Sequence, residues 1–114
     1  MSNYYDLKDV KEMAGGDEDF LKVIVETFLE EIPPDVRSMN EAIENGNPSL
    51  AYQYAHKMKP NLQLFGLDLM EQVLTIEAWS KGNAKEANAQ TAGERISAKV
   101  TLAQHQLKKD FNLE

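Results

Sequence analysis

Residues 17–32 read DEDFLKVIVETFLEEI and carry the strongest helical pattern in the chain. Large apolar residues recur there at every fourth position: Phe20, Ile24, Phe28 and Ile32. The positions beside them are apolar too: Leu21, Val25 and Leu29. This apolar face is wider than a surface helix needs, so the segment predicts a central helix. Asp17 is placed to cap its N-terminus, and Glu18 and Asp19 favour the positive end of its dipole.

Helix breakers divide the remaining chain, and no stretch alternates β-branched with polar residues as a strand would. Pro33-Pro34 is expected to end the central helix and begin another, because proline is tolerated in a first turn. Asn47-Pro48 predicts an N-cap followed by proline, and Gly66 and Gly82 predict helix ends. The expected helices cover about residues 6–14, 17–32, 33–46, 48–65, 67–81 and 84–111. The last has a seam of small and apolar residues: Ala89, Ala92 or Gly93, Ile96, Val100, Ala103 and Leu107.

The predicted fold class is all-α. Four of the segments are long enough for an antiparallel four-helix bundle with short loops, and one or two short extra helices lie at the N-terminal end. A chain of 114 residues suits a single domain, taken here as 1–114. Such a bundle supports many unrelated activities, so the fold alone predicts no function.

Composition excludes several classes of function. The chain has 12 basic and 19 acidic residues, a net charge of −7, which disfavours binding to nucleic acid. The absence of cysteine excludes disulfides, thiolate metal sites and a cysteine nucleophile. No apolar run reaches the roughly 18 residues of a membrane span, and residues 1–9 lack the pattern of a signal peptide. We therefore expect a cytoplasmic protein without a membrane partner.

Residues 55–66 read AHKMKPNLQLFG and hold the candidate chemistry. With about 100° of rotation per residue, Met58 marks the buried face and His56 lies about 160° away, facing solvent. Tyr52, Lys59 and Gln63 lie within about 60° of His56 on the same outer face. An exposed neutral imidazole can attack phosphorus, and a lysine one turn later can offset the charge of the phosphoryl group. On spacing alone a polar surface histidine is the favoured interpretation, since H-x-x-K occurs by chance in many helices.

Several features of the chain together resemble a histidine-containing phosphotransfer (HPt) domain, over roughly residues 4–111. They are Tyr5-Asp6-Leu7, Gly16-Asp17, the apolar helix Phe20–Phe28, Ala55-His56-x-x-Lys59, Gly66 and Ile76-Glu77. The resemblance implies that His56 accepts a phosphoryl group from a receiver-domain aspartate and passes it to another receiver. It also implies that Lys59 stabilises the phosphohistidine and that Gly66 ends the helix.

The partners implied by the resemblance are response-regulator receiver domains, possibly of a hybrid histidine kinase, which would supply Mg²⁺. No cofactor is expected on this chain. It has no Gly-rich nucleotide loop, so it is expected to be a carrier and not an enzyme or a kinase by itself. The docking face predicted around His56 comprises Tyr52, Lys57, Pro60, Gln63, Leu64 and Leu67. Its positive charge would suit an acidic receiver pocket.

Pro60 departs from the family pattern, which has glycine after the lysine. Proline cannot donate to the His56 carbonyl and costs about 3 kcal/mol inside a helix, so we expect a kink between the two residues. The alternative function is a non-phosphorylated helical adaptor that binds or inhibits a signalling partner through the same face, and Pro60 favours it.

Other candidate sites are set aside. His105 also has a lysine three residues later, but it projects from the last helix and is interpreted as a solvated surface residue. Two histidines far apart in the sequence, without Glu-x-x-His pairs, predict no metal site. Trp79 is interpreted as core or bundle-end packing, and we expect a monomer.

Overall fold

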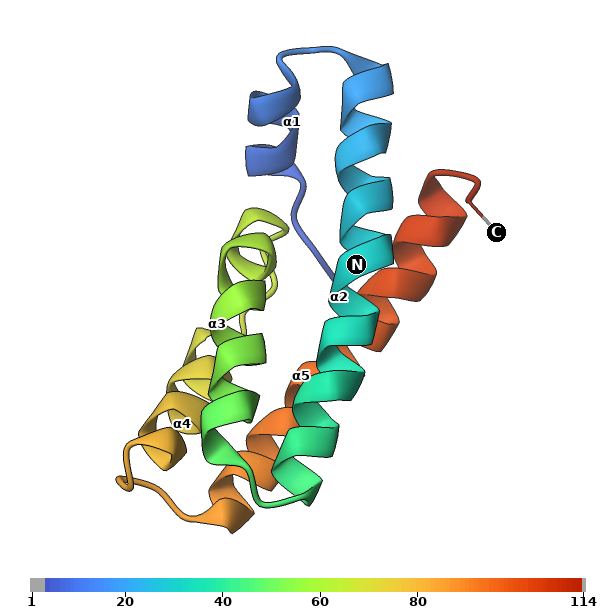
Figure 1. Cartoon of the computed structure of the whole chain (residues 1–114). Coiled ribbons are helices and arrows are strands. Elements are labelled where there is room, and N and C mark those ends of the chain that lie inside the picture. The colour runs from blue at the N-terminus through green and yellow to red at the C-terminus, as the bar shows by residue number, and fades with distance from the viewer. Residues whose placement is uncertain (1–3, 114) are drawn as a thin grey trace.

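The computed structural model describes residues 4–113, and in that range the protein is all-helical, with five helices and no strand (Figure 1). The helices are α1 (Lys8–Ala14), α2 (Glu18–Glu44), α3 (Pro48–Leu64), α4 (Met70–Ser80) and α5 (Glu86–Asp110). α2 packs against α3 and α5, and α4 packs against the same two helices, so the four long helices form a ring of neighbours. α1 packs on α2. None of these helices is both long and apolar enough to cross a membrane.

The prediction that Pro33-Pro34 would end a helix is wrong, because α2 continues through both prolines. Neither proline can donate a backbone hydrogen bond, which leaves two carbonyls one turn earlier without helical donors. Packing on both sides offsets this loss. Buried side chains continue across the prolines at helical spacing: Phe28, Ile32, Val36, Met39 and Ile43. Because α2 remains one continuous helix, all five of these side chains lie in the same core.

The predicted helix starts are confirmed where side chains cap them. The Asp17 carboxylate accepts a hydrogen bond from the Phe20 amide at 3.1 Å. The Asn47 side chain accepts one from the Leu50 amide at 3.2 Å, with Pro48 in the first turn. Both caps satisfy backbone donors that the helix itself leaves unpaired.

The core lies between α2, α3, α4 and α5 and reaches α1 through Val10. The Phe28 and Phe65 rings pack with centroids 4.2 Å apart at its centre. The predicted seam of α5 is confirmed, since every member is buried. Phe20 does not extend the core as its spacing predicted, because its side chain remains 45% exposed.

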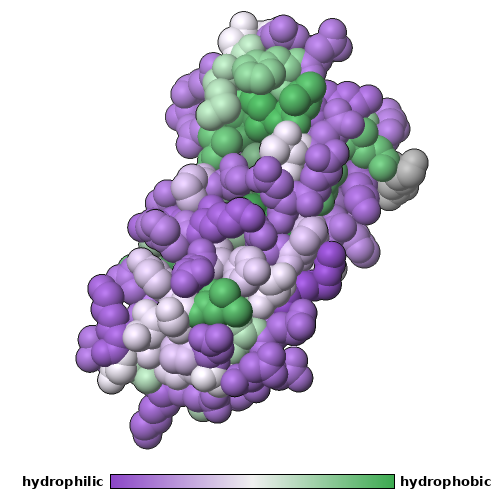
Figure 2. Space-filling model, in the orientation of Figure 1, coloured by the Kyte–Doolittle hydropathy of each residue, from purple (hydrophilic) through white to green (hydrophobic). Residues whose placement is uncertain are grey.

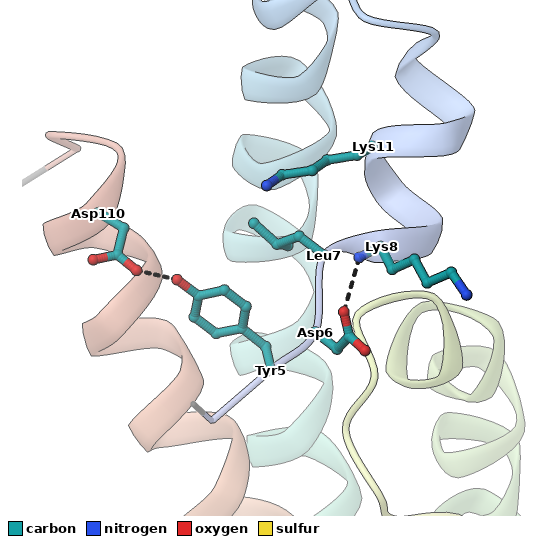
Figure 3. Close-up of a pocket in the computed structure, with 6 residues that line it drawn as sticks. All are labelled: Tyr5, Asp6, Leu7, Lys8, Lys11 and Asp110. Carbon is teal, nitrogen blue, oxygen red and sulfur yellow. Dashed lines mark hydrogen bonds between the residues drawn. The ribbon is translucent and has the colours of Figure 1, made fainter. Parts of the chain in front are cut away.

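The N-terminal segment before α1 crosses from α5 to the end of α3 (Figure 3). The Tyr5 hydroxyl donates a hydrogen bond to the Asp110 carboxylate near the end of α5. The Asp6 amide donates to the Phe65 carbonyl at 2.8 Å. Gly66 allows this approach: a Cβ at Gly66 would lie 2.6 Å from the Asp6 Cβ. The segment therefore ties both helix ends together.

Candidate functional site

α3 presents one buried and one exposed face, as its sequence predicts. The buried side chains are Ala51, Ala55, Met58 and Leu62, all at most 2% exposed. His56 projects from the opposite face and is exposed to solvent. Pro60 is exposed on the same side, and the helix continues past it to Leu64. The imidazole is thus accessible to solvent, and the helix that carries it packs against the core along its whole length.

Tyr52 is the aromatic neighbour of His56. The two ring centroids lie 5.6 Å apart at an interplanar angle of 38°. The Tyr52 side chain is half-buried and packs against the core, so it limits the movement of the imidazole on one side. Hydrogen bonding to the Glu77 carboxylate raises the pKa of the Tyr52 phenol. The Glu77 carboxylate of α4 therefore lies near the aromatic side of the site.

Glu77 is a member of the site that the helical projection of α3 could not find. Its carboxylate pairs with Lys81 at 3.3 Å, and hydrogen bonds from Lys81 and then Tyr52 lower its pKa. The charge of Lys59 adds to this effect. Negative charge on α4 therefore lies within reach of the lysine that would stabilise a phosphoryl group. In the sequence, the only indication was the position of Glu77 on the face of its helix that meets α3. The packing of α3 on α4 is what brings Glu77 close to Tyr52 and Lys59.

Lys59 is half-buried and lines a hollow of about 240 Å³ between α3 and the start of α4. Gln63 and Asp68 line the same hollow. The ammonium group and an amide thus border a recess beside the histidine face.

Lys57 makes an ion pair that the sequence did not predict. Its ammonium group lies 3.2 Å from the Asp35 carboxylate of α2, and Asp35 is 8% exposed. Asp35 stands three residues after Ile32 and four before Met39, so it interrupts an apolar helix face. That interruption is the only feature of the sequence that points to a partner for Asp35. The Lys57 side chain stays 61% exposed. Lys57 therefore lies at the edge of the predicted docking face and donates one hydrogen bond to Asp35 of α2.

Leu67 does not belong to the docking face, because it is only 6% exposed and part of the core. The end of α3 explains the error. Gly66 adopts φ +67°, its amide bonds to the Gln63 carbonyl, and the Leu67 amide bonds to the Leu62 carbonyl, both at 3.0 Å. This Schellman motif turns Leu67 back against Leu62. The role of Gly66 as a helix end is confirmed, while Leu64 is half-buried.

No group of three or more His, Asp or Glu side chains within residues 4–113 could hold a metal ion. His105 is exposed on α5, as its position predicts. Trp79 is partly buried and packs against the core.

The chain matches no protein-family model, no curated protein and no solved structure.

Proposed function

We propose that this protein is a phosphoryl carrier of the HPt kind, with His56 as the acceptor. The observation that carries the proposal is an exposed imidazole in the middle of an anchored helix, with Tyr52 against one side and Lys59 one turn away. In this proposal α2–α5 form the antiparallel four-helix bundle of that family, and α1 caps one end. The ring of neighbours and the short connections between these helices support this arrangement.

The proposed transfer is an in-line displacement. A neutral ring nitrogen of His56 attacks the phosphorus of a receiver's aspartyl phosphate. The new N–P bond forms as the acyl P–O bond breaks, and the aspartate carboxylate leaves. The receiver supplies Mg²⁺, and Lys59 offsets negative charge on the phosphohistidine. Transfer to the next receiver is the reverse step, so the chain contributes a nucleophile and a docking face.

The docking face in this proposal consists of Tyr52, Lys57, Pro60, Gln63 and Leu64. Lys59 beside this face supplies positive charge within an acidic chain, which suits an acidic receiver pocket, whereas the charge of Lys57 is partly offset by Asp35. Placement in the cytoplasm, monomeric state and a receiver partner are parts of the same proposal.

The test is transfer of labelled phosphate from a phosphorylated receiver domain, or from a small-molecule phosphoramidate, to the chain. His56→Gln is compared with His105→Gln, a matched control because His105 is also exposed and also has a lysine three residues later. We expect acid-labile, base-stable label on the wild type and on His105→Gln, and none on His56→Gln. Label on His56→Gln, or none on a folded wild type from either donor, would refute the proposal.

The second candidate is a helical adaptor that binds a partner without carrying phosphate. The exposed Pro60 ring beside His56 favours it, since the HPt pattern has glycine there. Unlabelled wild type that still binds a receiver, with the same affinity for His56→Gln, would establish this function instead.

A further inference from the structure

An apolar patch lies at the end of the molecule far from His56. Figure 2 shows apolar atoms gathered where α1 and the first turns of α2 lie in Figure 1. The large apolar side chains exposed on these two elements are Met13 of α1 and Phe20 and Val23 of α2, at 55%, 45% and 53%, and we call these three residues the apolar patch. The other large apolar side chains exposed on α3, α4 and α5 stand singly: Leu50, Leu74 and Leu102.

The start of α2 extends beyond both of the long helices that pack against it, α3 and α5 (Figure 1). At 1.5 Å per residue, the 27 residues of α2 span about 40 Å and the 17 residues of α3 only about 26 Å. Over its first turns α2 is covered by the seven-residue α1 on one side. Phe20 and Val23 lie about 60° apart around the axis and form one stripe on the uncovered side. A stripe of this kind is typical of a surface that buries against another protein.

The charge around the patch defines its occupant. Residues 8–31 contain three lysines and eight acidic residues, a net charge of −5 of the chain's −7. All eight acidic side chains are exposed. Asp19, Glu26 and Glu30 lie within about 60° of Val23 on the helical projection, whereas Lys22 lies about 100° away. The apolar stripe is therefore bordered by negative charge.

We propose that this patch binds a basic amphipathic helix of a partner protein. The apolar side of that helix would cover Met13, Phe20 and Val23, and its lysines or arginines would face the carboxylates of α2. A second copy of this chain is disfavoured, because it would bring two ends of charge −5 together. The turn of α2 that carries Asp35, the partner of Lys57, lies 12 residues beyond Val23, about 18 Å along the axis. The patch is thus separate from the histidine face and independent of the proposed phosphotransfer.

The test uses a 14-residue peptide with leucine at positions of one helical face and lysine elsewhere, and a matched peptide with glutamate in place of lysine. Binding to the full chain is measured by fluorescence anisotropy at low and at physiological salt. Phe20→Ser/Val23→Ser is compared with Leu102→Ser, a control with similar exposure on α5. All three side chains are exposed, so the variants should keep the fold, which circular dichroism checks.

We expect the lysine peptide to bind, the double variant to bind at least tenfold more weakly, and Leu102→Ser to bind as the wild type does. Glu26→Lys/Glu30→Lys should weaken binding severalfold, more strongly at low salt. His56→Gln should have no effect, which separates this inference from the phosphotransfer proposal. No binding, equal binding to the double variant or equal binding of the glutamate peptide would overturn the inference. A dimer of the chain that the double variant disperses would assign the patch to a second copy.

Discussion

Gly66 tests how the N-terminal segment and the end of the candidate helix depend on each other. Gly66 has φ +67°, and a Cβ added there would lie 2.6 Å from the Asp6 Cβ and 3.0 Å from the Asp6 backbone nitrogen. Gly82 has φ +79° with no atom within 4 Å of such a Cβ. The two glycines share the strain of a left-handed backbone and differ in the contact with Asp6.

Gly82→Ala should therefore cost only the backbone strain, about 1–2 kcal/mol. Gly66→Ala adds displacement of the N-terminal segment. Moving it breaks the Asp6 amide bond to the Phe65 carbonyl and the Tyr5 bond to Asp110, each worth about 0.5–1.5 kcal/mol. We expect Gly66→Ala to destabilise the protein by about 1–3 kcal/mol more than Gly82→Ala.

Urea unfolding followed by circular dichroism measures both losses, and amide hydrogen exchange at Asp6 reports the local effect. Protection of the Asp6 amide should fall in Gly66→Ala and stay unchanged in Gly82→Ala. In a background of Asp6→Gly, which removes the contacting Cβ, the extra cost should shrink by at least about 0.5 kcal/mol. Equal losses for the two alanine variants, with Asp6 protection intact in both, would refute the reasoning.

Three further predictions concern Lys59, Tyr5 and Gly93. Lys59→Gln should slow phosphotransfer and shorten the lifetime of phosphohistidine more than Lys57→Gln, because Lys57 is already paired with Asp35; equal effects in a transfer time course would contradict this. Burial of the Tyr5 phenol and, second in size, its hydrogen bond to Asp110 raise the pKa of Tyr5. As the pH rises, Tyr5 therefore ionises in the unfolded chain before it ionises in the folded protein. The stability from this bond should be complete below about pH 10 and lost as the pH rises further, and Tyr5→Phe should flatten that loss in unfolding curves from pH 8 to 11. Gly93→Ala should destabilise the protein by about 1–3 kcal/mol, although alanine has the better helix propensity, because the added Cβ would lie 2.8 Å from the buried Ile43 Cδ1. A higher Tm of this variant would contradict the prediction and show that α2 and α5 separate easily.

The outward position of His56 could be predicted because it depends on one helix. Rotation of about 100° per residue separates the imidazole from Met58 whatever the helix packs against. The caps at Asp17 and Asn47 are equally local, since each bonds an amide three residues later. The seam of α5 follows from spacing within a single segment.

Contacts between segments far apart in the sequence could not be predicted in this way. The ion pair of Lys57 with Asp35 joins residues 22 positions apart, and the effect of Glu77 on the pKa of Tyr52 needs α4 beside α3. Leu67 was misplaced because the helical projection ended one residue before the Schellman turn that buries it.

Sequence alone is sufficient to predict where most helices begin and end, which face of each is apolar and which histidine is exposed on the outer face of α3. These properties depend on local hydrogen bonds and on helical periodicity. The continuation of α2 through Pro33-Pro34 depends instead on tertiary packing, because burial on both sides of the prolines offsets their lost hydrogen bonds. Tertiary packing also sets the close approach of Asp6 to Gly66, and it leaves Phe20 exposed where the start of α2 extends beyond α3. Packing between distant segments sets these features, and no local pattern encodes it.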